Sequence, residues 1–545
     1  MRKVRILAGV FLLLFAGGLL WAAGEQEGAM TESGREIVTV DWFVNEGWFN
    51  RPWDMERPVD QLITEETGVQ INFMSSAGGG TGTEKLNAMI AADDLSDVVT
   101  MGWWYSQFQE LQAAGMLHPL NEVIPEHSTE LWARVPEFMR NWYTYDDGNW
   151  YGFANFFWDP DQFTERNFME SNVGMVARKD IMDELGITAE DFLTQDGMIE
   201  ALKKVRDADI TYNGLNVVPL YFTPNGGFPG TYTWDSMFAV PRENRQGNVV
   251  DVRRQEKYLE EMLFANRLFQ EGLISKENWT ADRNQINEKI VSGSIFAMIC
   301  NLADYQTQWA NLYRADNAAE FVAVGPVHAQ DQAEPQFVST GYTGWLVSTI
   351  SEDTDYLEEI IGLWDFLYSE EGLLATTYGI EGDSYVWGDD GRVQWTDTYI
   401  DYLNDPEVNP SQDIYGNWNM WLLHNPVNDQ QVKPPPATAA EAVGVNIKRY
   451  FAKYTYNETA FNNLGPFGGS DEAAISAEID TYWEAQLPKM ILADGGPDEV
   501  RAIYEESIAH IERLGLDAVL EVRNERFQQN KEKLGWDYAW PPLRN

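Results

Sequence analysis

Cysteine is almost absent from this chain of 545 residues, which contains only Cys300. A single thiol cannot form an internal disulfide, so the folded state must depend on its hydrophobic core, and a chain of this length can bury a large one. Cys300 ends the apolar run Ile295–Cys300, and free cysteine is among the residue types most often buried. The run therefore predicts a buried strand, and not a nucleophile.

Basic residues are also scarce. Lysine and arginine together number 38, against 86 aspartates and glutamates, which gives a formal net charge of −48 at pH 7. A surface this acidic repels nucleic acids and anionic lipids, so we expect no nucleic acid as a partner. Because the acidic residues are spread along the whole chain, they indicate a solvated surface, and salt adaptation is a hypothesis that fits it.

Motifs for metal binding and for nucleophilic catalysis are missing. The five histidines lie far apart, and the sequence contains no H-E-x-x-H, G-x-S-x-G, G-x-x-x-x-G-K-[ST] or C-x-x-C. Residues 207–216 resemble a calcium loop only weakly, because Tyr212 and Val218 occupy the positions of the turn glycine and the bidentate acid. We therefore expect no metal and no catalytic residue. A carboxylate pair that could serve a glycosidase stays open as an alternative.

Long apolar runs are limited to the N-terminus. The run Ile6–Trp21 follows three basic residues and precedes the small residues Ala22, Ala23 and Gly24. This pattern predicts a secretory signal peptide at residues 1–24, and the run is short for a bilayer span of about 20 residues. We expect the mature protein to be periplasmic or extracellular.

Aromatic residues, in contrast, are abundant: the chain has 22 tryptophans, 24 tyrosines and 26 phenylalanines, or 13% of all residues. Some of these rings belong to the core. Flat apolar ring faces also suit ligands that have apolar C–H faces, and sugars are the main example.

Strand and helix patterns alternate along the chain. Strand patterns at 37–44, 69–73 and 97–101 enclose helical patterns at 58–67 and 84–92, an order typical of an α/β domain with a largely parallel sheet. Pro434–Pro436 indicates an extended connector. Further on, we predict strands at 173–177, 295–300, 321–324 and 345–347, helices at 179–185, 198–206, 257–271, 356–368 and 497–514, and a hairpin at 382–395.

Several blocks resemble one protein family: Leu86–Val99, Trp150–Phe153, Gly174–Asp180, Tyr378–Trp387, Ile479–Trp483 and Leu514–Asp517. In their order and spacing they resemble the family 1 extracellular solute-binding proteins, the receptor components of bacterial ABC importers. The most similar branch is that of the large lipoprotein-type and alginate-binding-type oligosaccharide receptors. That branch often carries a lipid-modified cysteine, and its absence here implies a freely diffusing receptor.

The resemblance implies an α/β, two-lobed periplasmic-binding-protein fold with hinge crossovers and an interlobe cleft. The family pattern assigns residues 25–155 and 326–378 to the N-terminal lobe, and residues 156–325 and 379–545 to the C-terminal lobe. The implied function is capture of a carbohydrate by hinge closure and delivery to an ABC permease in the inner membrane, with the receptor acting as a monomer. No cofactor is implied, and the degenerate loop 207–216 leaves the calcium ion of the branch in doubt.

Ligands bind open α/β sheets at the carboxyl ends of strands, so the candidate residues come from strand ends and crossovers. Tryptophan would stack on sugar rings, and Asn, Asp and Glu would bond hydroxyls, although core packing explains each tryptophan equally well. We favour Trp104 and Trp234, and we expect Trp42 and Trp364 in the core. The candidates are Trp48, Trp53, Trp103, Trp104, Asn155, Trp158, Trp234, Asp235, Trp345, Glu381, Tyr385 and Trp387.

Two other functions share these features. A secreted carbohydrate-active enzyme would have the same export signal and aromatic content, and a peptide or siderophore receptor would have the same fold. Within the carbohydrate-receptor hypothesis, the acidic chain favours a neutral oligosaccharide, because carboxylates around a cleft repel an acidic sugar.

Overall fold

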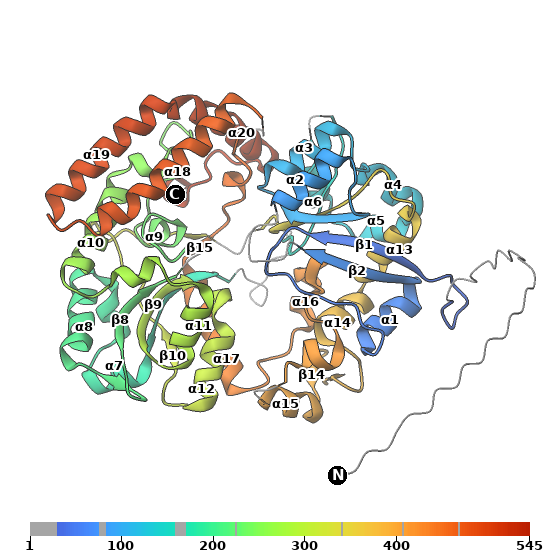
Figure 1. Ribbon diagram of the computed structural model, residues 1–545, viewed down its shortest axis with the longest axis horizontal. Coiled ribbons are helices and arrows are strands. Elements are labelled where there is room, and N and C mark those ends of the chain that lie inside the picture. Colours follow the sequence, from blue (N-terminus) through green and yellow to red (C-terminus); the bar gives the residue numbers. More distant parts are fainter. Residues whose placement is uncertain are drawn as a thin grey trace, which may run out of the picture.

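The computed structural model describes residues 30–75, 83–145, 147–158, 170–223, 226–338, 342–405, 408–466 and 469–544. The predicted signal peptide lies outside these residues. The described chain forms two lobes, each built around its own sheet (Figure 1). No helix in these ranges is both long enough and apolar enough to cross a bilayer.

The sheet of the first lobe has the strand order β2-β1-β3-β12-β4. Strands β1, β2 and β3 are parallel, whereas β12 is antiparallel to both of its neighbours. Every residue of β3 and β12 is buried, as expected for central strands between helical layers. The lobe contains β1 (Val38–Val44), β2 (Val69–Ser75), β3 (Val98–Gly102), β4 (Phe153–Ala154), β12 (Leu346–Ile350), β13 (Tyr385–Trp387), β14 (Val393–Trp395), α1 (Pro58–Thr67), α2 (Thr83–Ala92), α3 (Ser106–Ala114), α4 (Leu120–His127), α5 (Thr129–Arg134), α6 (Glu137–Trp142), α13 (Leu357–Leu367), α14 (Glu370–Tyr378), α15 (Asp397–Asn404) and α16 (Pro426–Val432).

The sheet of the second lobe has the order β10-β5-β9-β8. Strands β8 and β9 are parallel, and β5 is antiparallel to β9 and β10. Cys300 is buried in β9, as the sequence predicts. The lobe contains β5 (Val173–Arg178), β6 (Thr211–Tyr212), β7 (Leu215–Asn216), β8 (Val218–Phe222), β9 (Ile295–Asn301), β10 (Phe321–Ala323), α7 (Lys179–Leu185), α8 (Gln195–Ala208), α9 (Tyr232–Met237), α10 (Glu256–Gln270), α11 (Arg283–Val291), α12 (Gln306–Ala315), α17 (Ala439–Phe451), α18 (Asp471–Ile491), α19 (Pro497–Leu514), α20 (Leu516–Leu534) and α21 (Pro541–Arg544).

The lobe boundaries differ from the predicted ones. Val327 and Phe337 are buried in the core of the second lobe, so the second crossover follows Phe337 instead of starting at residue 326. Tyr399 and Leu423 are buried in the core of the first lobe, so residues 379–432 belong there and not to the second lobe. The third crossover is the segment 433–438, where Pro434–Pro436 keeps the chain extended between α16 and α17. Beside the crossovers, β11 (Phe337–Val338) pairs in parallel with β15 (Thr455–Tyr456).

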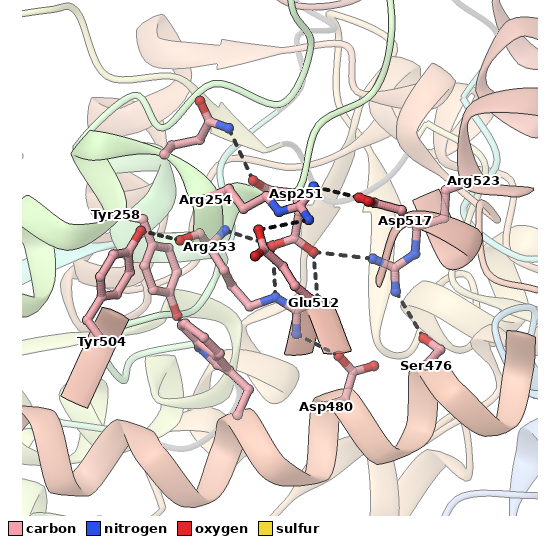
Figure 2. A network of polar contacts seen from close by, with 12 residues as sticks. Asp251, Arg253, Arg254, Tyr258, Ser476, Asp480, Tyr504, Glu512, Asp517 and Arg523 are labelled. Atoms are coloured by element: carbon pink, nitrogen blue, oxygen red, sulfur yellow. Dashed lines mark hydrogen bonds and ion pairs between the residues drawn. The ribbon is translucent and has the colours of Figure 1, made fainter. Parts of the chain in front are cut away.

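A buried polar network ties the C-terminal helices to the second lobe (Figure 2). The carboxylate of Asp251 accepts the backbone N–H of Arg253 at 3.0 Å and two guanidinium N–H groups of Arg253 at 2.8 and 2.6 Å. Arg253 also pairs with Asp480 of α18 at 3.1 Å, and its carbonyl accepts the hydroxyl of Tyr504 of α19 at 2.5 Å. Arg523 of α20 lies 3.9 Å from Asp251. Asp251 and Arg253 together thus connect α18, α19 and α20.

Candidate functional site between the lobes

The topology of the first-lobe sheet brings three loops to one edge. Strands β1 and β3 are parallel, and β12 is antiparallel to β3, with Leu346 opposite Gly102. The loops that follow β1 and β3 therefore meet the loop that precedes β12. In Figure 1, β1 and β2 end on the side that faces the second lobe. Trp48 and Trp345 come from two of these loops.

Four rings form what we call the aromatic platform: Trp48, Phe156, Trp345 and Trp421. The ring centroid of Trp48 lies 6.2 Å from that of Trp345 and 6.0 Å from that of Trp421, both in stacked orientations. Trp345 and Trp421 are 5.1 Å apart, and Phe156 lies 6.2 Å from Trp421. Trp48 is 51% exposed, and the other three are half-buried. These rings form a contiguous, partly exposed apolar surface, in which Trp345 and Phe156 are tilted by 34° and 44° relative to Trp421.

Hydrogen bonds from the surrounding loops hold the platform in place. The Oδ1 atom of Asn155, which is fully buried, accepts the backbone N–H groups of Trp345 at 3.3 Å and Leu346 at 2.9 Å. Asn155 is therefore a positioning residue here, and its side chain does not face solvent. Trp48 donates its indole N–H to Glu46 at 2.8 Å. Burial raises the pKa of Glu46, although this hydrogen bond opposes the shift.

A second set of contacts, made through His424 and Asp429, holds Phe156 in place. The backbone of Phe156 has a φ of +47°, and its N–H donates to the carbonyl of His424 at 2.9 Å. The rings of the two residues lie 4.5 Å apart. His424 Nε2 is 3.6 Å from Asp429 Oδ2, and Tyr378 donates its hydroxyl to the same carboxylate. Burial alone would raise the pKa of Asp429, but the hydrogen bond and charge of His424 hold it below the usual value.

Trp103 and Trp104 follow β3 at the same edge. Trp103 is half-buried and donates its indole N–H to the carbonyl of Gly344 at 2.9 Å, next to the platform. Trp104 is 49% exposed, and its ring meets Trp103 edge-on at 5.5 Å. Trp53 is half-buried, and its ring lies beneath the guanidinium of Arg51 at 5.3 Å, so packing explains its position.

In the second lobe, the structure exposes a different aromatic residue from the predicted one. Trp234 is fully buried and donates its indole N–H to Gly227 at 2.9 Å, so its ring has no face open to a ligand. Tyr232, at the start of α9, is 39% exposed. A Cβ atom on Gly226, which has a φ of +98°, would lie 2.2 Å from the Tyr232 ring, so this ring rests on the Gly226 backbone. Helix α9 turns Trp234 into the core and leaves Tyr232 of the same segment exposed.

Asp235 is paired with another acid instead of facing a ligand. Asp235 Oδ1 and Glu261 Oε2 are both buried without a hydrogen-bond donor, and the other oxygen of Glu261 accepts the N–H of Gly230 at 2.7 Å. Burial is the main cause that raises the pKa of Asp235 to about 7, and burial also raises the pKa of Glu261. One proton shared between the two carboxyl groups would satisfy both orphaned oxygens.

We expect this pair to make stability fall as pH rises through about 7. The unfolded chain ionises Asp235 near pH 4, whereas the folded chain keeps it protonated until about pH 7, so folding is favoured at low pH and this contribution is lost as pH rises. Asp235→Asn should therefore be more stable than the wild type at pH 8 and show a shallower slope of Tm between pH 5 and 8. Asp183→Asn, at a carboxylate that is 65% exposed, should keep the wild-type slope, and a wild-type slope in Asp235→Asn would contradict the assignment.

The remaining candidates lie apart from the platform. Trp158 is buried in a small cluster with Val427 and Tyr342. Tyr385 is buried against Tyr378 in another cluster, and burial raises its pKa to about 12. Glu381, Tyr385 and Trp387 belong to the β13–β14 hairpin region, which Figure 1 places at the lower end of the first lobe, away from β1 and β2. Trp42 and Trp364 are fully buried, as predicted.

A cavity of about 480 Å³ opens between the two lobes. Asn404 at the end of α15 contributes the wall from the first lobe, and the ends of α12 and α17 contribute the wall from the second. None of the four platform rings lines this cavity. The lining residues are Tyr313–Asn317, Asn404 and Thr438–Ala440.

In the weak calcium-like segment 207–216, residues 207 and 208 end α8, and residues 211–216 form a hairpin of β6 and β7. Asn213 and Gly214 form its turn with φ values of +50° and +81°. Tyr212 donates its hydroxyl to Asp316 at 2.9 Å. Within the part of the chain that the structure describes, no three His, Cys, Asp or Glu side chains are grouped as metal ligands.

Sequence reasoning missed Phe156, Trp421, His424 and Tyr232. The alternation of Asn and Trp in Asn417–Trp421 was a usable signal, because polar and aromatic residues in a short irregular segment are typical of binding loops. Phe156 adjoins the predicted Asn155, but its left-handed backbone cannot be read from the sequence.

Comparisons with known proteins give consistent results. A family model described as bacterial extracellular solute-binding protein matches residues 53–373. Lipoprotein LipO of Bacillus subtilis is 23% identical over 226 residues, which span 39% of this chain and only 43% of LipO. The polygalacturonan/rhamnogalacturonan-binding protein YtcQ of the same species is 23% identical over 403 residues, or 71% of this chain and 75% of YtcQ.

Solved structures share the fold over nearly the whole chain. The S. pneumoniae ABC-transporter substrate-binding protein FusA in complex with kestose has a TM-score of 0.67 at 17% identity, covering 91% of this chain and 100% of FusA. The alginate-binding protein AlgQ2 without calcium ion has a TM-score of 0.62 at 18% identity, covering 90% of this chain and 98% of AlgQ2.

Proposed function

The chain belongs to the bacterial extracellular solute-binding proteins, and from this premise we propose that it captures an oligosaccharide for an ABC importer. The family and the two-lobed α/β fold inferred from the sequence resemblance are confirmed. In this proposal the exported protein acts as a monomer, closes around the sugar and passes it unaltered to a permease.

The aromatic platform is the observation that carries the proposal. Trp48 stacks on Trp345 and Trp421, and strand β1, which precedes Trp48, ends on the side of the first lobe that faces the second lobe (Figure 1). Sugar rings have apolar C–H faces that pack on such surfaces, and each aromatic contact contributes about 0.5–1.5 kcal/mol. Among the similar proteins, YtcQ and AlgQ2 are named for polymers of acidic sugars, and FusA is bound to kestose. These names support a saccharide and leave its charge open.

Capture would work through a shift between open and closed lobes. A ligand that contacts both the platform and the Tyr232 region of the second lobe favours the closed form by the contacts it gains there. Micromolar affinity requires about 8 kcal/mol net. Several ring contacts and hydroxyl hydrogen bonds can supply this after the cost of ordering.

The experiment that tests the proposal uses the mature protein and a panel of oligosaccharides. We expect at least one to quench or shift tryptophan fluorescence, to bind in calorimetry and to raise Tm by several degrees. Chromatography of the same mixture should return the sugar unchanged. Hydrolysis that disappears when one carboxylate is replaced would establish the enzyme alternative, and binding of peptides or siderophores alone would establish the other receptor alternative.

A further inference from the structure

A half-buried carboxylate without a cation lies at the exposed edge of the aromatic platform. Glu46 follows β1, and its Oε2 atom accepts the indole N–H of Trp48, the most exposed platform ring, at 2.8 Å. Among the residues that the structure describes, no Lys, Arg or His pairs with this carboxylate, and no other donor forms a hydrogen bond with it. Its second oxygen, Oε1, is therefore a free acceptor beside a ring that a sugar would contact.

The pairing of β1 with β3 places Glu46 where two loops meet. The N–H of Asn45 donates to the carbonyl of Thr100 in β3 at 2.8 Å, so the next residue, Glu46, lies beside the end of β3. Gly102 ends that strand, and a Cβ atom added to it would be 2.6 Å from the ring of Trp104, so this ring lies on the Gly102 backbone. Trp104 is 49% exposed. The loops after β1 and β3 thus each present an exposed tryptophan near the Glu46 carboxylate.

The surroundings of Glu46 make its negative charge costly. Burial raises the pKa of Glu46, and the indole N–H of Trp48 opposes this shift. Burial is also the main cause that raises the pKa of Tyr105, and the charge of Glu46 adds to it, in agreement with a carboxylate close to the loop after β3. A hydroxyl that donates to Oε1 would stabilise this charge, because hydrogen bonds to ionised acceptors are stronger than neutral ones. A second carboxylate would be repelled, with no cation to offset the repulsion.

We propose that Glu46 is a specificity-determining residue: its free oxygen accepts a hydroxyl of the sugar ring that packs on Trp48, and its charge excludes rings that carry a carboxylate from this position. The inference rests on the proposed function and deepens it, because it names uncharged sugars as the class that this position selects. Such a ligand differs from the acidic sugars for which YtcQ and AlgQ2 are named. The net charge of −48 does not decide this by itself, because salt screens charges beyond about 8–10 Å, whereas Glu46 would act at hydrogen-bond distance.

Calorimetry on the full mature protein tests this with matched pairs of trisaccharides: neutral hexose trimers, and hexuronate trimers of the same configuration and linkage. We expect the wild type to bind its tightest neutral trimer about ten- to hundredfold more tightly than the matching uronate trimer. Glu46→Gln should reduce this ratio about tenfold, because the amide oxygen can still accept the indole N–H of Trp48 while the charge is gone. Tm should stay unchanged or rise, since the variant lacks a half-buried charge that has no cation beside it.

Glu381→Gln is the matched control, because it removes the same charge from the same lobe at an exposed glutamate that bridges to β13, away from the platform. It should keep the wild-type ratio. If Glu46 only held Trp48 in place, Glu46→Gln would also keep that ratio. This result, or a wild type that binds uronate trimers as tightly as neutral ones, would overturn the role of Glu46 and leave oligosaccharide capture standing. Failure of every saccharide to bind would overturn both.

Discussion

Replacing Trp48 by alanine is expected to weaken oligosaccharide binding about ten- to hundredfold, or about 1.4–2.7 kcal/mol. Trp48 is the most exposed ring of the aromatic platform and stacks on both Trp345 and Trp421. Its removal deletes the largest open apolar face of the platform and unpacks the two rings behind it. Calorimetry with the tightest saccharide measures the loss, and circular dichroism checks that the fold is intact.

Trp387→Ala is the matched control for that experiment. Trp387 is also a solvent-exposed tryptophan of the first lobe, at 38% exposure. Nothing in the sequence distinguishes it from Trp48 as a candidate for ligand binding. It lies on the β13–β14 hairpin, away from the platform, so its replacement should leave affinity unchanged. Equal losses in the two variants, or no loss in Trp48→Ala, would contradict the location of the site.

Replacing Asp251 by alanine should lower the free energy of unfolding by about 3–5 kcal/mol, because it leaves a buried guanidinium without its main partner. The Asp251 side chain is 2% exposed and that of Arg253 is 9% exposed. Three hydrogen bonds between the two residues would be lost, together with the link to α20 (Figure 2). Urea unfolding followed by circular dichroism gives the change.

Asp517→Ala tests whether the effect depends on burial. Asp517 pairs with Arg254 at 2.9 Å in the same network, but its side chain is 85% exposed. Exposed ion pairs contribute about 0–1 kcal/mol. The free energy of unfolding of this variant should therefore lie within about 1 kcal/mol of the wild-type value. A similar loss of unfolding free energy in both variants would mean that burial makes no difference, and that the network stabilises the fold through its charges alone.

Much of the fold could be predicted because local patterns and tertiary packing agree. Helix 58–67 was expected to end before Gly68, and Gly68 caps α1 in the left-handed conformation. The helices at 179–185 and 497–514 have the predicted limits. Patterns of period 2 and 3.6 record which face of an element is buried, and this is a local property of the sequence. Helices α17, α18 and α20 were not predicted, although α17 contains a clear apolar face.

The candidate site was predicted only in part, because it lies in loops. Trp48 and Trp345 were named, and the structure joins them to Phe156 and Trp421. Trp234 was favoured, yet it is fully buried. Loops lack the regular spacing of apolar residues that shows, in helices and strands, which side chains point into the core. A buried tryptophan and a solvent-exposed one therefore look alike in the sequence of a loop.

The sequence by itself determined the family, the alternation of strands and helices and the presence of two α/β lobes, since these depend on residue patterns within short segments. Only the tertiary structure decided that residues 379–432 pack on the first lobe, and that Tyr232 and not Trp234 is exposed. These features depend on contacts between segments far apart in the chain, and a single sequence does not record such contacts.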